Sequence, residues 1–107
     1  MTESGPGMAI LKPVGRLNMA SAAHLKEGVA VALGRGLTRI VVDLSEVDFM
    51  DSSGLGAIVN GLMSARVQGG DLRLAAVSWQ ANLVLKLTNM DQVFVVHDDA
   101  RTAFADD

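Results

Sequence analysis

The sequence has no cysteine among its 107 residues. That absence excludes disulfides, cysteine-ligated zinc sites, iron–sulfur clusters and thiol catalysis, and it fits a reducing compartment. Long apolar runs are missing too, since no stretch approaches the roughly 18 residues of a membrane-spanning helix. Residues 1–7 have neither a basic region nor an apolar core, so they do not form a signal peptide. We therefore expect a soluble, cytoplasmic domain that does not engage a membrane.

Basic residues are too few for nucleic-acid binding through a positive footprint. Nine Lys and Arg stand against twelve Asp and Glu, which gives a formal net charge of −3 and a pI of about 5.2. Hydrophobic residues make up 50% of the chain and the mean hydropathy is +0.32, which excludes disorder and is enough for one core. We expect a flexible lead over residues 1–7 and one domain over residues 8–107.

The start of the domain predicts strand structure followed by a helix. Pro13 interrupts an apolar run, so residues 8–17 form two short strands or one bent strand at a sheet edge, where proline is tolerated. Asn18 or Ser21 caps the helix that follows, and Gly36 supplies a left-handed end.

After residue 36, predicted strands alternate with predicted helices. Residues 38–44 lack polar–apolar alternation, which favours burial on both faces, as in a parallel sheet. We expect Leu83, Val84 and Leu87 to face inward from a helix over residues 80–88. The remaining elements are a polar connection at 45–52, a helix with an apolar stripe from Leu55 to Met63, strands at 72–77 and 93–96, and a terminal helix at 98–104. This order predicts an α/β fold with a small, mixed but mostly parallel sheet of four to five strands and about four helices.

The segment from Asp48 to Gly56 lies at a predicted junction of strand and helix, where open α/β sheets place their sites. Ser52 or Ser53 stands at the helix N-terminus, where unpaired backbone N–H groups favour a phosphate. Simple capping explains most Asp-Ser-Ser-Gly sequences. Two glycines in a first helical turn, however, cost about 1 kcal/mol each and indicate a close approach to the backbone, by a partner or by the sheet.

Four stretches give the sequence a specific resemblance. They are Gly15-Arg-Leu-Asn18, Val41-Val-Asp-Leu44, Phe49-Met-Asp-Ser-Ser-Gly-Leu-Gly56 and Gly69-Gly70. From about Met8 to Phe104 the chain resembles a STAS domain of the bacterial anti-sigma factor antagonist family.

The resemblance implies a switch rather than an enzyme, with no cofactor and no metal. In that family a serine kinase, which is also the anti-sigma factor, phosphorylates the first serine after the aspartate, here Ser52. The unphosphorylated antagonist binds the kinase and frees the sigma factor; phosphorylation releases the antagonist, and a PP2C-type phosphatase resets it. We expect the free chain to be a monomer.

The resemblance also implies a docking surface around Ser52. Its predicted members are Asp48, Met50, Asp51, Ser53, Gly54, Leu55 and Gly56, with Asn18 and Ser21 as neighbours. Ser53 is expected mainly to cap the helix, and Met50 and Met90 to flank the docking face. The family usually has Asp where this chain has Asn18. We expect docking to survive this change and phosphorylation efficiency to differ.

Other classes of function remain as alternatives. One is a stand-alone STAS subunit of a transporter ATPase or a stress-signalling assembly, and another is a sensor of a small ligand. A serine hydrolase is disfavoured because the elbow motif G-x-S-x-G is not met around Ser52. His24 and His97 lack a second histidine at metal-ligand spacing, and His24 is expected on a helix surface. We expect Trp79 to pack in or near the core.

Overall fold

The computed structural model describes residues 1–3 and 5–105 of the chain. Its helices in this part are α1 (Met19–Gly34), α2 (Ser52–Val67) and α3 (Trp79–Leu87), with the 3₁₀ turns η1 (Met90–Gln92) and η2 (Ala100–Thr102). The strands are β1 (Thr2–Glu3), β2 (Met8–Leu11), β3 (Gly15–Leu17), β4 (Arg39–Asp43), β5 (Val47–Met50), β6 (Asp71–Ala75) and β7 (Val96–His97).

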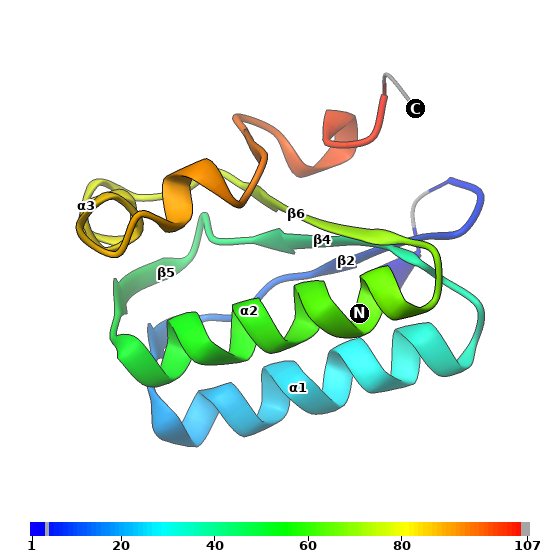
Figure 1. The fold of residues 1–107 in the computed structure, drawn as a ribbon, viewed down its shortest axis with the longest axis horizontal. Coiled ribbons are helices and arrows are strands. Elements are labelled where there is room, and N and C mark those ends of the chain that lie inside the picture. The colour runs from blue at the N-terminus through cyan, green and yellow to red at the C-terminus, as the bar shows by residue number, and fades with distance from the viewer. Residues whose placement is uncertain (4, 106–107) are drawn as a thin grey trace.

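The strands form two sheets. The larger has the order β1-β2-β4-β6-β7, in which only the β1–β2 pair is antiparallel. The smaller is the parallel pair β3 and β5. Helices α1 and α2 lie together on one side of the large sheet, and α3 and the C-terminal turns lie on the other (Figure 1). The predicted α/β fold with a mostly parallel sheet is confirmed.

Strand β4 is the centre of the core. Ile40, Val41 and Val42 are fully buried, as expected for a parallel strand covered on both faces. Ile40 and Val42 belong to the cluster that α1 and α2 complete, whereas Val41 packs with Phe104 of the C-terminal segment.

The predicted number of helices is slightly too high, because residues 98–104 do not form a full helix. They contain only η2, which Asp99 caps by accepting a hydrogen bond from the Arg101 backbone N–H. The predicted polar connection at 45–52 contains a strand, β5. In the strand predicted at 93–96, Phe94 is buried and only Val96 joins the sheet. Strand β2 is not at an edge, since it pairs with β1 in the predicted lead and with β4.

Several apolar side chains face outward against prediction. Helix α3 buries Ala81 and Leu85, so Leu83 and Leu87 on its other side are exposed. The exposed fractions are 41% for Leu83, 76% for Leu87, 64% for Met63 and 80% for Trp79. No helix in the described part of the chain is both long and apolar enough to span a membrane.

Candidate functional site

Two helices begin side by side where the small sheet ends. Leu17 of β3 and Met50 of β5 lie opposite each other in the parallel register. The next residues, Asn18 and Asp51, are the N-caps of α1 and α2. A hydrogen bond of 3.2 Å from the Asp51 N–H to the Leu17 carbonyl joins the two strand ends. The structure thus brings the two predicted groups of site residues together at one end of the molecule.

The start of α1 is closed by a reciprocal capping box. The Asn18 side-chain oxygen accepts from the N–H groups of Ala20 and Ser21, at 3.1 and 3.3 Å. Ser21 Oγ accepts from the Asn18 N–H at 2.9 Å and donates to the Arg16 carbonyl at 2.7 Å. Asn18 is therefore the cap and Ser21 its partner, so the two polar residues serve the same helix start.

The start of α2 is capped by Asp51 and not by a serine. Asp51 Oδ1 accepts from the Gly54 N–H at 3.0 Å, so the capping role expected of Ser53 belongs to Asp51. Ser52 is the first residue of α2 and is exposed, and Ser53 is half-buried. Within residues 1–3 and 5–105, neither hydroxyl has a hydrogen-bond partner. Ser52 is thus exposed to solvent and plays no part in the cap.

The glycines and apolar residues of this loop differ in role. A Cβ at Gly54 would collide with the Leu17 carbonyl oxygen, so packing on the sheet explains this glycine. Gly56 is exposed with open space beside it. Met50 and Leu55 are buried, and they can shape a docking surface only through their backbone. Among the apolar residues of the loop, the exposed side chain is Phe49, and the Arg16 guanidinium lies 4.7 Å from its ring centroid.

Gln80 closes the other edge of β5. Its Oε1 accepts from the Met50 N–H at 2.8 Å, and its Nε2 donates to the Met50 carbonyl at 2.9 Å. The side-chain amide thus takes the place of a neighbouring strand and ties the first turn of α3 to the residue two before Ser52. We call this pair of bonds the Gln80 clamp. Sequence reasoning missed it, because a side-chain amide bound to a strand edge has no sequence signature.

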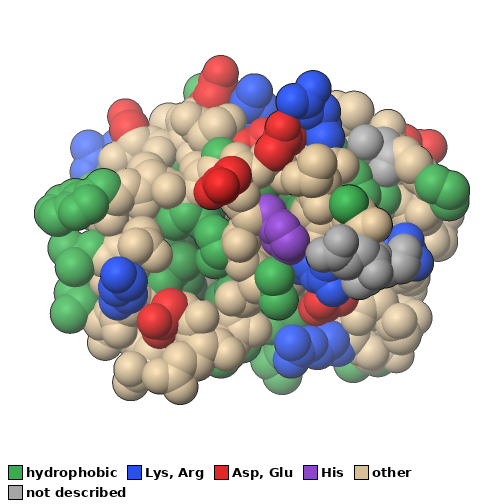
Figure 2. Space-filling view, turned by 90° about the horizontal axis from the view of Figure 1, so that it is seen from above, with side chains coloured by type: hydrophobic (Ala, Val, Ile, Leu, Met, Phe, Trp, Pro, Cys, Tyr) green, Lys and Arg blue, Asp and Glu red, His purple; other side chains and the backbone are tan. Residues whose placement is uncertain are grey.

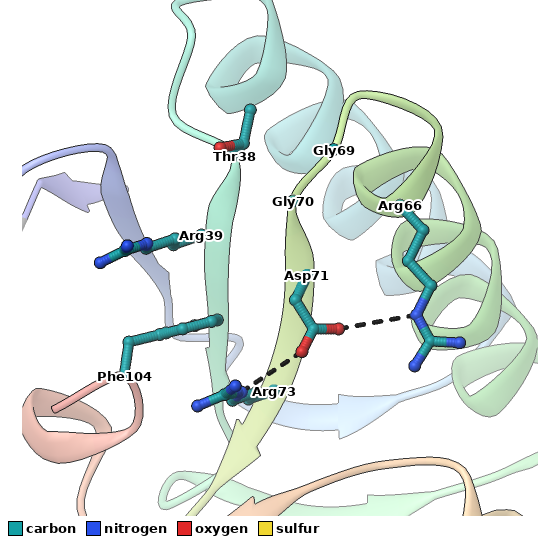
Figure 3. A pocket seen from close by; sticks show the side chains of 8 residues that line it. All are labelled: Thr38, Arg39, Arg66, Gly69, Gly70, Asp71, Arg73 and Phe104. Atoms are coloured by element: carbon teal, nitrogen blue, oxygen red, sulfur yellow. Dashed lines mark hydrogen bonds and ion pairs between the residues drawn. The ribbon is translucent and has the colours of Figure 1, made fainter. Parts of the chain in front are cut away.

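A separate depression of about 350 Å³ lies at the other end of α2 (Figure 3). Arg66, which lines it, is about 20 Å from Ser52 along the helix, given a rise of 1.5 Å per residue. In this depression Asp71 pairs with Arg66 at 3.7 Å and with Arg73 at 3.3 Å. Arg73 also donates to the Ala103 carbonyl at 2.9 Å and stacks 4.3 Å from the Phe104 ring centroid. Arg73 thus holds the C-terminal segment on the sheet, and the depression is not part of the Ser52 site.

Metal chemistry finds no support in the described residues. No group of three or more His, Asp or Glu in residues 1–3 and 5–105 is arranged to hold an ion. His24 lies on the exposed side of α1, as expected. His97 has a buried Nε2 without a hydrogen-bond partner in the part of the chain that the structure describes. Neither histidine is joined to the Ser52 loop by a hydrogen bond or an ion pair among those residues.

The family profile, the sequence relatives and the solved structures that match this chain agree with one another. A family profile described as STAS domain matches residues 1–103. A Thermotoga maritima protein named "Putative anti-sigma factor antagonist" is 36% identical over 92 residues, which cover 85% of this chain and 81% of that protein. The crystal structure of a protein with that description from Thermotoga maritima has a TM-score of 0.86 and 33% identity, over 96% of this chain and 89% of the other. The Bacillus cell fate determinant SpoIIAA in its phosphorylated form, at 18% identity, shares the fold with a TM-score of 0.71, over 89% of this chain and 86% of its own.

Proposed function

Because the chain belongs to the STAS domain family and, within it, to the anti-sigma factor antagonists, we propose that it is a partner switch controlled by phosphorylation of Ser52. Unphosphorylated, it binds an anti-sigma factor that is also a serine kinase, and the sigma factor is released. Once phosphorylated, it dissociates from the anti-sigma factor. A PP2C-type phosphatase restores it. In this cycle the chain is a cytoplasmic substrate and not an enzyme, and it needs no cofactor, nucleic acid or membrane.

The exposure of Ser52 and its hydroxyl, unpaired in the described part of the chain, carry the proposal. Ser52 is an exposed serine at the first position of α2, and its hydroxyl has no hydrogen-bond partner within the described residues. A kinase can therefore reach it without unfolding any element. The cap belongs to Asp51, so modification of Ser52 leaves the helix start intact.

The effect of a phosphate here is electrostatic. A phosphoserine adds about −1.5 to −2 charges at pH 7. The helix N-terminus tolerates this charge, because its dipole favours anions. The docking surface does not, since Asp48 is exposed and Asp51 half-buried in the same loop. A docked partner would then have to accept a third, strongly hydrated anion. A coupling of about 3 kcal/mol is enough to weaken binding roughly a hundredfold.

Three baits test the proposal. Immobilised wild type, Ser52→Asp and Asn60→Asp are exposed to lysate of the source cell, and bound proteins are identified by mass spectrometry. Asn60 is exposed on the same helix, so its variant adds an equal charge away from the loop. Wild type and Asn60→Asp are expected to retain a serine-kinase anti-sigma factor that Ser52→Asp does not. Retention of a transporter ATPase by all three baits would contradict the switch and support a constitutive interaction module.

A further inference from the structure

We propose that α3 provides a second half of the docking surface: Trp79, Leu83 and Leu87, here called the α3 stripe, bind an apolar groove on the same anti-sigma factor that acts on Ser52. This inference rests on the proposed function. It adds a contact that the signature around Ser52 does not contain.

The α3 stripe is a continuous apolar surface. Its members are four residues apart, which places them next to one another along one face of the helix. Their exposed fractions of 80%, 41% and 76% contrast with the fully buried Ala81 and Leu85 on the opposite face. Figure 2 shows hydrophobic side chains gathered at the α3 end of the molecule. Large exposed apolar patches of this kind mark interaction sites in soluble proteins.

The spacing of the stripe fits one mode of recognition. Apolar anchors four residues apart on a short helix insert into a hydrophobic groove of a partner. The helix carries one charged residue, Lys86, at the border of the stripe. Trp is also the residue type that most often dominates binding energy at protein interfaces.

The stripe is tied mechanically to the phosphorylation site. Through the Gln80 clamp, the residue after Trp79 holds both backbone groups of Met50, two residues before Ser52. The stripe and the Ser52 loop are therefore joined by two direct hydrogen bonds. Figure 1 shows α3, β5 and the start of α2 at the same end of the molecule. Phe49 on β5 and Met19 at the start of α1 add further exposed apolar side chains near the two helix starts.

The charges at this end favour a different protein over a second copy as the occupant. A two-fold contact presents the same patch twice, so it would bring Asp48 and Asp51 of one copy toward those of the other, in a chain of net charge −3. Exposed Asp91, just after α3, adds to the repulsion. The partner is therefore a different protein, with basic side chains facing Asp48 and Asp91 and an acidic side chain facing Lys86 beside its apolar groove.

The test measures the affinity of the serine-kinase anti-sigma factor recovered on the wild-type bait, by titration calorimetry. Trp79→Ala and Leu87→Ala are compared with Val67→Ala, whose side chain is 86% exposed at the far end of α2. We expect the two α3 variants to bind at least tenfold more weakly and Val67→Ala to bind like wild type. All three should unfold at the wild-type temperature, because the truncated side chains are exposed.

Three other results would overturn the α3 contact. Wild-type affinity in both α3 variants overturns the α3 contact and leaves the Ser52 switch intact. Failure of the wild-type chain to bind any serine-kinase anti-sigma factor overturns the proposed function and this inference with it. Sedimentation equilibrium that shows a wild-type dimer and a Trp79→Ala monomer overturns it in favour of a second copy.

Discussion

Gly54 lies so close to Leu17 that a Cβ at position 54 would collide with the Leu17 carbonyl oxygen and lie 2.8 Å from its Cγ. The contact presses the first turn of α2 onto the end of β3. It sets the position of Ser52 two residues earlier, because that turn begins at Ser52. The sequence suggested that either a partner or the sheet comes close to the backbone at Gly54. In the structure it is the sheet.

Replacing Gly54 by Ala should therefore destabilise the domain by about 2 kcal/mol, since a backbone collision outweighs the gain in helix propensity. Gly56→Ala is the matched control. Nothing lies within 4 Å of a Cβ there, so we expect no loss and a gain of up to about 1 kcal/mol. Urea unfolding of both variants measures the difference. Equal stabilities would show that the turn can move away from β3.

The Gln80 clamp should influence the proposed phosphorylation of Ser52. Gln80→Ala removes two hydrogen bonds to Met50, and we expect a loss of stability of about 1–3 kcal/mol. Hydrogen exchange at the Met50 amide should accelerate, and kcat for phosphorylation of Ser52 should fall more than the affinity for the kinase.

Gln80→Glu refines this test, because it keeps an acceptor for the Met50 N–H and loses the donor to the Met50 carbonyl. The Met50 amide exchange rate and the kcat for Ser52 phosphorylation of Gln80→Glu should lie between those of wild type and Gln80→Ala. A Gln80→Ala variant with wild-type exchange and wild-type kcat would show that the clamp does not position Ser52.

Asn18 should tolerate replacement by the residue usual in the family. Asn18→Asp keeps an oxygen for the N–H groups of Ala20 and Ser21 and adds a negative charge at a helix N-terminus, so a gain of about 0.3–1 kcal/mol is expected. Asn18→Ala should lose about 1 kcal/mol with the cap. Thermal unfolding gives both values. Phosphorylation kinetics of Asn18→Asp then show whether the charge at this position matters, and an unchanged rate would contradict our expectation that it does.

The cap of η2 predicts a pH dependence at the C-terminal segment. Hydrogen bonds from the Arg101 side chain and backbone N–H lower the pKa of Asp99 from 3.8 to about 2. Since the pKa is lower in the folded state, the carboxylate stabilises the turn above about pH 4, and this contribution is lost as the pH falls through 2. An NMR titration of Asp99 should give this value, and Arg101→Met should raise it toward 3.8.

The elements with strong local signals were predictable. The cap at Asn18 and the doubly buried β4 follow from side-chain chemistry and β-branched composition that act over a few residues. The start of α2 was predicted as well, but its cap is Asp51 and not Ser53. The outward face of α3 could not be predicted in this way. Leu83 and Leu87 fit a buried stripe as well as Ala81 and Leu85 do, and only the packing of α3 beside β5 decides between them. The Gln80 clamp joins residues 30 apart and is a tertiary contact with no local signal.

The affinity of the anti-sigma factor for two forms of this chain decides whether Ser52 is the switch. One form is unphosphorylated, and the other carries phosphate on Ser52 alone, as verified by mass spectrometry, with Ser52→Ala as the unmodifiable reference. We expect Ser52→Ala to bind like the unphosphorylated chain and the phosphorylated form to bind about a hundredfold more weakly. Equal affinities for the two forms, or stoichiometric phosphorylation of Ser52→Ala by the same kinase, would contradict it.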